Sequence, residues 1–407
     1  MELIQGGVTA AKGFAAAGVE AGIKYKNRKD MALVYSSVPC QVAGTFTTNV
    51  VKAAPVLWDK HLVETAPFVQ AVVVNSGIAN ACTGKEGYEC CEATAKATGE
   101  ILGVPTDAVL VASTGVIGMQ LPIDKLVAGV EKLAAAKEES LEAGTLAAEA
   151  IMTTDTVSKQ VAVSFRAGGK TVTIGGMCKG SGMIHPNMCT MLAFMTTDLK
   201  ISKALLQKAV SESIDDTFNM VSVDGDTSTN DTFLLLANGM AGNDEITEEN
   251  EDYQAFKEAL MYVNTYLSKK MAGDGEGATA LFETKVIGAS SKKDAKTLAK
   301  AVICSSLTKA AIFGHDANWG RILCALGYSG AQFDPDKVEL FFQGGGKQIQ
   351  IYGGGKAVDY SEEEATAILS EKEVTVLVDM HAGEADATAW GCDLSYDYVK
   401  INADYRS

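Results

Sequence analysis

The feature that most constrains the fold is the alternation of short apolar runs with amphipathic runs along all 407 residues. Runs of strand length, such as 31–36, 70–75 and 109–112, are separated by segments with helical spacing of apolar side chains, such as 86–102 and 123–137. A chain built in this way predicts an α/β protein in which helices cover sheets.

Two further pairs of apolar runs are interrupted only by glycine-rich turns, which is typical of antiparallel hairpins. These pairs are 160–166 with 170–176, and 338–343 with 348–352. Hairpins mixed among helices disfavour a doubly wound parallel sheet and favour helices layered over two stacked sheets. We also predict helices at 144–152, 202–215, 249–271, 294–312 and 362–370, and strands at 43–48, 190–196, 231–237 and 373–379.

Composition excludes several classes of protein. The chain has 35 Lys and Arg against 51 Asp and Glu, a net charge of −16. This charge argues against nucleic-acid binding, because phosphate contact needs concentrated basic residues. The sequence shows neither a basic stretch followed by an apolar segment at its start nor a run of about 18 apolar residues. We therefore expect a cytoplasmic protein without a signal peptide or a membrane span.

The cysteines and histidines do not predict a metal site. None of the nine Cys forms a CxxC pair, and none of the four His belongs to an HExxH motif. In a reducing compartment the cysteines are expected to be free thiols, mostly packed as small buried hydrophobes. Phosphate-binding, dinucleotide-binding and GxSxG motifs are also missing from the sequence.

The segment 178–198 has a layout that suits self-cleavage. A glycine-rich approach from Lys179 to Met183 leads to Thr190, a hydroxyl residue at the first position of an apolar strand. The Thr190 hydroxyl could attack the carbonyl of residue 189 and form an ester that water resolves. The new α-amino group, with a pKa of roughly 7.7–8.0, would then serve as the base for its own hydroxyl. The alternative interpretation is a glycine loop that leads into a core strand.

The same segment carries a resemblance to a known family. The residues KGSGMI at 179–184, PNM at 186–188 and TML at 190–192 resemble the self-processing motif of the ornithine acetyltransferase, or glutamate N-acetyltransferase, family of arginine biosynthesis. The resemblance spans the whole chain. It also includes the segments 6–14, 75–81, 113–118, 152–155, 223–231, 316–321 and 398–405.

The resemblance implies a processed enzyme. Thr190 would be both the residue that cleaves the chain and the catalytic nucleophile, with the cut between Cys189 and Thr190. The products would be an α chain, 1–189, and a β chain, 190–407. Thr114 and Gly115 would form the oxyanion hole, the first through its hydroxyl and the second through its backbone N–H. Cys189 departs from the alanine usual in the family. It is nearly as small, and it adds a second nucleophile that we disfavour because Thr190 holds the start of the strand.

The resemblance also implies a set of substrate contacts. Lys179 would pair with the α-carboxylate of an amino-acid substrate, and Glu276 would pair with the amine of ornithine. The full set of residues implied to bind substrate is Thr153, Lys179, Thr190, Glu276, Asn402 and Ser407.

The implied reaction is a ping-pong transfer of acetyl from N2-acetylornithine to glutamate, giving ornithine and N-acetylglutamate. It needs no metal or redox cofactor, and acetyl-CoA is a second acetyl donor in bifunctional members. The implied fold is an α-β-β-α sandwich resembling amino-terminal-nucleophile hydrolases with a different topology, and the implied assembly is α2β2. Two alternatives remain open: a self-cleaving amidase or aminopeptidase, in which water resolves the intermediate, and a binding protein whose chain stays uncut.

Overall fold

The computed structural model describes residues 1–185 and 191–404, which divide into two compact units. Unit 1 consists of Met1–Gly180, Pro186–Phe218 and Thr227–Leu267. Unit 2 consists of Ser181–His185, Asn219–Asp226 and Ser268–Ser407.

Unit 1 is built on a ladder of nine strands in the order β1-β6-β7-β8-β10-β3-β4-β5, with β2 also paired to β3. The strands are β1 Glu2–Ile4, β2 Phe14–Val19, β3 Met31–Phe46, β4 Val69–Ile78, β5 Val109–Val116, β6 Lys159–Ala167, β7 Lys170–Lys179, β8 Leu192–Thr197 and β10 Thr232–Ala237. The helices are α1 Ala54–Thr65, α2 Gly84–Leu102, α3 Ile123–Ala136, α4 Leu141–Ala150, α5 Lys203–Asp216 and α6 Glu251–Gly273. From Ser268 onward, α6 belongs to unit 2.

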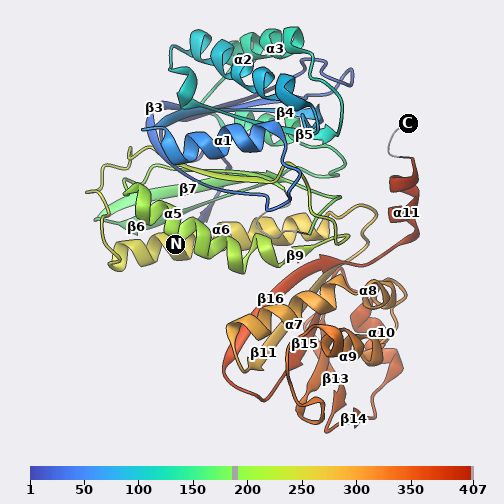
Figure 1. Ribbon diagram of the computed structural model, residues 1–407. Helices are drawn as coiled ribbons and strands as arrows, with labels where there is room; N and C mark the ends of the chain where they lie inside the picture. The colour runs from blue at the N-terminus through green and yellow to red at the C-terminus, as the bar shows by residue number, and fades with distance from the viewer. Residues whose placement is uncertain (186–190, 405–407) are drawn as a thin grey trace. The chain divides into compact units, whose positions relative to one another are not determined.

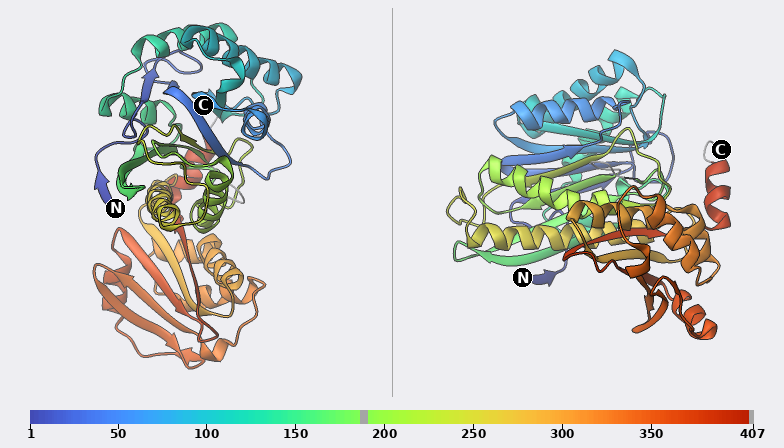
Figure 2. Two further views of the ribbon diagram at one scale, coloured as in Figure 1. Left: turned by 90° about the vertical axis from the view of Figure 1, so that its left-hand side faces the viewer. Right: turned by 60° about the horizontal axis from the view of Figure 1, so that its bottom comes forward.

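Strand β3 converts this ladder into two layers. The first half of β3 pairs with β2 and β4, and its second half, from Gln41 to Phe46, pairs with β10. The register of β3 against β4 shifts between Tyr35 and Cys40. Helices α2 and α3 lie outside one layer, and α5 and α6 lie outside the other (Figure 1). Helices α5 and α6 run side by side (Figure 2), where the amide of Asn264 donates to the hydroxyl of Ser213. The predicted α/β class and α-β-β-α sandwich are therefore confirmed in unit 1.

The centre of the sandwich is almost entirely apolar. All ten residues of β4 and all six of β8 are buried. A strand covered on both faces can be apolar on both of them, which explains the apolar runs 71–74 in β4 and 192–195 in β8. Strand β8 lies between β7, to which it is antiparallel, and β10, to which it is parallel. The predicted division into 1–189 and 190–407 stays a prediction, and it would leave unit 1 composed of both chains.

Unit 2 has its own sheet of seven strands in the order β14-β13-β12-β15-β11-β16-β9. The strands are β9 Val221–Ser222, β11 Leu281–Ala289, β12 Glu339–Gly344, β13 Lys347–Gly353, β14 Lys356–Ala357, β15 Glu373–Asp379 and β16 Ala385–Cys392. The helices are α7 Lys292–Cys304, α8 Ser306–Phe313, α9 Trp319–Tyr328, α10 Glu362–Leu369 and α11 Tyr396–Ala403. Helix α7 packs against β11 and β16.

One predicted helix, 294–312, is wrong as a single element. The structure breaks it at Ser305, whose backbone is extended and whose hydroxyl accepts a hydrogen bond from the Thr308 N–H. Serine in this position caps the first turn of a new helix and so favours a break that apolar periodicity does not reveal. No helix among the described residues is long and apolar enough to cross a lipid bilayer.

Candidate active site

The two residues predicted to form the oxyanion hole lie at the carboxyl end of β5. Strand β5 runs parallel to β4 and places Gly115 beside Gly77. Gly115 has a φ of +131°, and a Cβ atom there would come within 2.2 Å of the Gly77 carbonyl carbon. Only glycine fits this close approach of two backbones, so the direction of the Gly115 N–H is fixed by the pairing of the strands.

A buried asparagine holds the backbone just before Thr114. The side-chain amide of Asn230 donates to the carbonyl oxygens of Ala79, at 2.6 Å, and Ser113, at 2.8 Å. The hydroxyl of Ser113 in turn donates to the carboxamide oxygen of Asn75. Asn75 and Asn230 belong to the family segments 75–81 and 223–231, but the sequence predicts no role for either, because asparagine is also common in ordinary turns.

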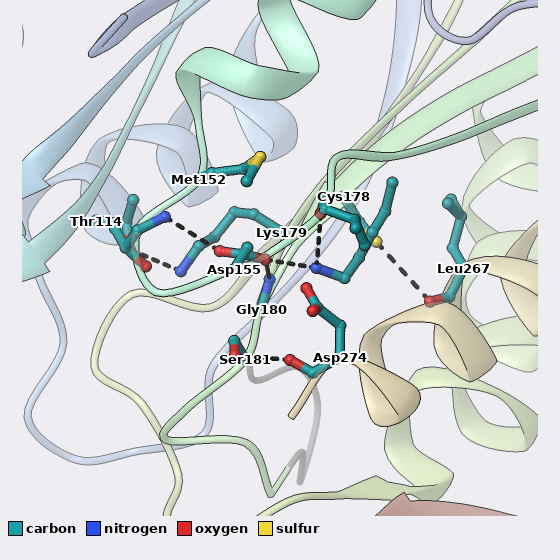
Figure 3. Close-up of polar contacts among 12 residues, drawn as sticks. Thr114, Met152, Asp155, Cys178, Lys179, Gly180, Ser181, Leu267 and Asp274 are labelled. Atoms are coloured by element: carbon teal, nitrogen blue, oxygen red, sulfur yellow. Dashed lines mark hydrogen bonds and ion pairs between the residues drawn. The ribbon is translucent and has the colours of Figure 1, made fainter. Parts of the chain in front are cut away.

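Lys179 approaches the oxyanion-hole threonine from the end of β7. Its ammonium lies 3.3 Å from the Thr114 hydroxyl oxygen, although the residues are 65 positions apart in the sequence (Figure 3). The Lys179 side chain is largely buried, with 8% of the residue exposed. An ammonium can only donate, so the Thr114 oxygen accepts from it and the Thr114 proton remains available for another acceptor.

Asp155 balances the charge of two buried lysines. Its carboxylate accepts hydrogen bonds from the Lys159 ammonium and from the Gly180 N–H, both at 2.7 Å. Figure 3 shows the contact with Gly180. Burial alone would raise the pKa of Asp155. The charges of Lys179 and Lys159 and the two hydrogen bonds outweigh it and lower the pKa to about 2. Asp155 is therefore a permanent anion that holds the start of the glycine-rich segment.

Thr153, a predicted substrate contact, is held by the same carboxylate. Its backbone N–H donates to the second oxygen of Asp155 at 3.1 Å, and its carbonyl accepts from the Arg28 guanidinium at 2.8 Å. The structure thus brings Thr114, Thr153 and Lys179 into one connected polar network around Asp155 in unit 1.

Two other predicted contacts meet in unit 2. The amide nitrogen of Asn402, on α11, donates to the Glu276 carboxylate at 2.8 Å. The Glu276 backbone N–H donates to the Ser181 carbonyl at 3.0 Å. A Cβ atom on Gly182 would lie 2.3–2.4 Å from the Glu276 carboxyl group, so a glycine at this position lets the carboxylate lie against the backbone.

Asp224 fixes the next residues of the glycine-rich segment. Its two carboxylate oxygens accept from the backbone N–H groups of Met183, at 2.6 Å, and Ile184, at 2.8 Å. Its carboxyl group also hydrogen-bonds to Tyr398 of α11. Burial raises the pKa of Asp224, and these backbone donors oppose the shift. Sequence reasoning missed this role, since the acidic loop 223–231 resembles a solvated turn.

His185 is the last described residue before the predicted cut. Its Nδ1 lies 3.0 Å from the Ser222 hydroxyl and 3.5 Å from the Cys304 sulfur. Burial, aided by the positive charge of Lys300, lowers the pKa of His185 to about 4. The imidazole is therefore neutral at physiological pH.

Three predicted site residues, Cys189, Thr190 and Ser407, lie outside the described residues. Within the described ranges, one group of side chains has the spacing of metal ligands: Glu339, Asp379 and His381, whose ligand atoms lie within 4.8 Å of one another. His381 Nε2 lies 3.0 Å from Glu339, so a hydrogen bond between imidazole and carboxylate accounts for this grouping without an ion.

Comparison with known proteins identifies the family. The model of the ArgJ family matches residues 15–407. The chain belongs to the ArgJ family. A curated ArgJ protein of Symbiobacterium thermophilum, named arginine biosynthesis bifunctional protein ArgJ, is 54% identical over 409 residues and covers 100% of both chains. The ArgJ 1 protein of Clostridium acetobutylicum is 54% identical over 394 residues, covering 97% of this chain and 96% of its own.

A solved ArgJ structure also matches. The crystal structure of the ArgJ protein from Bacillus halodurans is 45% identical, with a TM-score of 0.50, and covers 52% of this chain and 97% of its own. These ArgJ matches confirm the family inferred from the motifs.

Proposed function

We propose that this chain is an acyltransferase of arginine biosynthesis that moves acetyl from N2-acetylornithine to glutamate through an ester on Thr190. Membership in the ArgJ family, whose curated members are named bifunctional proteins of arginine biosynthesis, supports this reaction and not the amidase alternative. The observation that carries the proposal at the site is the convergence of Thr114, Gly115 and Lys179 at the end of β5.

Maturation by cleavage between Cys189 and Thr190 is part of this proposal. Strand β8 begins two residues after the cut and is buried between β7 and β10, so a new amino terminus would start from a firmly held strand. The solved ArgJ chain from Bacillus halodurans matches 52% of this chain. Residues 190–407 are a similar share, a little over half of the sequence.

In the first half-reaction, the Thr190 hydroxyl oxygen attacks the acetyl carbon of N2-acetylornithine. Its proton passes to the free α-amino group of the same residue. The Thr114 hydroxyl and the Gly115 N–H donate to the oxyanion. Because Lys179 donates to the Thr114 oxygen, the hydroxyl proton of Thr114 is directed away from Lys179 and toward another acceptor. Ornithine then leaves with the proton.

In the second half-reaction, the amine of glutamate attacks the acetyl carbon of the ester and passes a proton to the α-amino group of Thr190. The bond between that carbon and the Thr190 oxygen then breaks, the proton moves to this oxygen, and N-acetylglutamate leaves. Both amino acids carry the same α-carboxylate, which Lys179 binds, and Thr153 completes that contact. Glu276, oriented by Asn402, binds the side-chain amine of ornithine. Ser407 is the remaining proposed contact.

Acetyl-CoA is the proposed second acetyl donor, and no metal or redox cofactor takes part in the proposed reaction. The proposed state of the protein is an α2β2 assembly in the cytoplasm.

Intact mass measured under denaturing conditions, combined with acetyl transfer, tests the proposal. We expect two fragments that meet at Cys189/Thr190 in the wild type and one uncut, inactive chain in Thr190→Ala. Cys189→Ala, which restores the residue usual in the family, is the matched control and should be cut and active. Acetyl transfer by uncut Thr190→Ala would overturn the proposed nucleophile. Consumption of N2-acetylornithine that does not depend on glutamate or another acceptor would favour the hydrolase.

A further inference from the structure

The loop that joins β2 to β3 concentrates positive charge in a chain that is acidic as a whole. Four of its six residues from 24 to 29 are basic, namely Lys24, Lys26, Arg28 and Lys29, whereas the chain has a net charge of −16. The contacts proposed for the amino-acid substrates lie elsewhere in the chain, so this local charge calls for an explanation of its own.

The basic loop lies against the strand ends that carry the predicted oxyanion hole. Strand β4 places Gly77 beside Gly115 of β5. A Cβ atom on Gly77 would lie 3.0 Å from the Cβ of Lys24 and 3.9 Å from the ring of Tyr25. Because Gly77 has no side chain, the loop packs directly against the backbone that neighbours Gly115.

Arg28 connects the same loop to Thr153, a predicted substrate contact. Its guanidinium donates to the carbonyl oxygens of Met152, at 2.5 Å, and Thr153, at 2.8 Å. The loop therefore reaches two parts of the candidate site in unit 1: the end of β5 and the segment that Asp155 holds.

Three of the four basic side chains form no ion pair with a carboxylate in the part of the chain that the structure describes. Lys29 is the exception, since its ammonium lies 3.0 Å from the Glu149 carboxylate. Lys24 donates to the hydroxyl of the neighbouring tyrosine at 2.8 Å, Arg28 donates to backbone carbonyls, and Lys26 is exposed. These three positive charges are available to an external anion.

The acidic residues at the two ends of the loop are engaged by its backbone. Glu20 accepts a hydrogen bond from the N–H of Asn27 at 2.6 Å. Asp30 accepts from the N–H groups of Ala21, at 2.7 Å, and Ile23, at 2.6 Å. These carboxylates fix the path of the loop and so hold its basic side chains in place.

Tyr25 gathers two of the cations. The Lys24 ammonium lies 4.6 Å from the centre of the Tyr25 ring, and the central guanidinium carbon of Arg28 lies 5.8 Å from it. An aromatic ring attracts cations, so it holds an ammonium and a guanidinium near each other despite their like charge. Because 43% of Tyr25 is exposed, a ligand can reach this group. Lysine and arginine side chains are the usual partners of phosphate groups in proteins.

We propose that Lys24, Lys26 and Arg28 bind the phosphate groups of acetyl-CoA and thereby allow this enzyme to use a phosphate-bearing thioester as its second acetyl donor. This inference rests on the proposed function. The diphosphate and the phosphate monoester of acetyl-CoA carry several negative charges, which suits three cations on one loop. N2-acetylornithine has only one carboxylate, for which Lys179 is the proposed partner.

The transfer from acetyl-CoA follows the first half-reaction with a thiol as the leaving group. The nucleophile oxygen bonds to the acetyl carbon, and the carbon–sulfur bond of the thioester breaks. The sulfur takes the proton that the nitrogen of ornithine takes in the other reaction.

Lys24→Gln combined with Lys26→Gln tests the inference. This double variant removes two charges and leaves Arg28 in contact with Thr153. We expect KM for acetyl-CoA to rise by about tenfold or more, because charge-assisted hydrogen bonds to phosphate are lost. Both kcat and KM for N2-acetylornithine should stay within about twofold of the wild type.

Lys170→Gln combined with Lys347→Gln is the matched control. It removes the same charge at two exposed positions in the turns of hairpins, and Lys170 lies at the end of β7 opposite to Lys179. It should change neither KM.

Calorimetric titration with CoA gives a second readout that does not depend on activity. The Kd for CoA should rise in the Lys24→Gln/Lys26→Gln variant and stay unchanged in the control. Dephospho-CoA, which lacks the phosphate monoester, should bind the wild type more weakly than CoA does. This difference should shrink in the double variant if its lysines contact that phosphate.

An unchanged KM for acetyl-CoA and an unchanged Kd for CoA in the folded double variant would overturn the inference and leave the proposed transfer from N2-acetylornithine intact. A wild type that uses N2-acetylornithine but not acetyl-CoA would do the same. A rise in KM for glutamate alone would assign the loop to an amino-acid carboxylate and also overturn the inference.

If the double variant does not fold, Lys26→Gln replaces it, because Lys26 is exposed and the change is confined to the surface. A smaller rise in the Kd for CoA then supports the inference, and an unchanged Kd overturns it. A wild type that transfers acetyl from neither donor would overturn the proposed function, and this inference with it.

Discussion

At the scale of single residues, the site depends on charges buried close together. Lys159 and Lys179 are both largely removed from water, and Asp155 is the anion that they share. Removing one member of such a group leaves an uncompensated buried charge, which costs far more than a surface ion pair is worth. The group therefore fixes Lys179 beside Thr114 with little freedom to move.

Asp155→Asn should for this reason lower both stability and activity. We expect the free energy of unfolding to fall by about 3–5 kcal/mol, because two buried ammonium groups lose their counter-ion. Urea unfolding measures this loss, and acetyl transfer measures the consequence for Lys179. Asp107→Asn, at an exposed site, is the control and should stay within about 0.5 kcal/mol of the wild type. Equal stability of the two variants would show that Asp155 does not hold the lysines.

The same carboxylate predicts the direction of an acid effect. The folded-state pKa of Asp155, about 2, lies below the ordinary value of about 3.9 for an unfolded chain. Its contribution to stability is thus complete above pH 4 and is lost as the pH falls toward about 2. Urea unfolding of wild type and Asp155→Asn between about pH 5 and pH 2 should give curves that converge as the pH falls. Parallel curves would contradict the shifted pKa.

Thr114 offers a sharper test of the oxyanion hole. Thr114→Val keeps the shape of the side chain but removes the donor, and kcat should fall by about 100- to 1,000-fold with a nearly unchanged KM. Thr114→Ser retains the hydroxyl and should keep most of the activity. If Thr114→Val raised KM and left kcat unchanged, the hydroxyl would contact the substrate only in its ground state.

At the scale of elements, the sequence predicts what local patterns determine and misses what depends on tertiary contacts. Apolar runs such as 70–75 and amphipathic runs such as 86–102 located β4 and α2, because burial on fixed faces leaves a periodic pattern. The two strands predicted at 31–36 and 43–48 are one strand, β3. The residues between them, 37–42, include Pro39 and break the apolar pattern, and within them the pairing of β3 passes from β4 to β10.

The site shows the same division. The motifs identified Thr114 and Lys179, but their mutual contact joins residues 65 positions apart and exists only in the folded chain. Asp224, Asn230 and Asp231 lie in one loop whose polar composition fits solvent exposure equally well. Asn230 and Asp231 are buried and Asp224 is half-buried because of the elements packed around them, which no local pattern encodes.

The close contact between Gly182 and Glu276 gives a prediction for the glycine-rich segment. Gly182→Ala would place a methyl group 2.3–2.4 Å from the Glu276 carboxyl group, so this flexible side chain must move. We expect KM for N2-acetylornithine to rise by about tenfold, because the displaced carboxylate would lose roughly one charge-assisted hydrogen bond to the substrate. Gly327→Ala, in α9, meets no neighbouring atom within 4 Å and is the control that should leave KM unchanged.

At the scale of the whole molecule, the proposed cut would fall inside a single sandwich. Strand β7 precedes the cut and β8 follows it, yet the two pair from Ile174 with Thr197 to Lys179 with Leu192. Neither chain has a complete version of this layer by itself. The two chains should therefore remain bound in native buffer and separate only when the sandwich unfolds.

This architecture predicts how thermal stability depends on protein concentration. Unfolding of the cut protein releases separate chains, so mass action should raise its midpoint temperature as the concentration increases. Uncut Thr190→Ala keeps its two halves joined, and that source of concentration dependence disappears. The measurement compares melting midpoints of both proteins over a hundredfold range of concentration in the same buffer. If the wild type, shown by mass to be cut, melted at a midpoint that did not change with concentration, its chains would not separate on unfolding. If Thr190→Ala showed the same slope as the wild type, the dependence would come from association between copies and not from the cut.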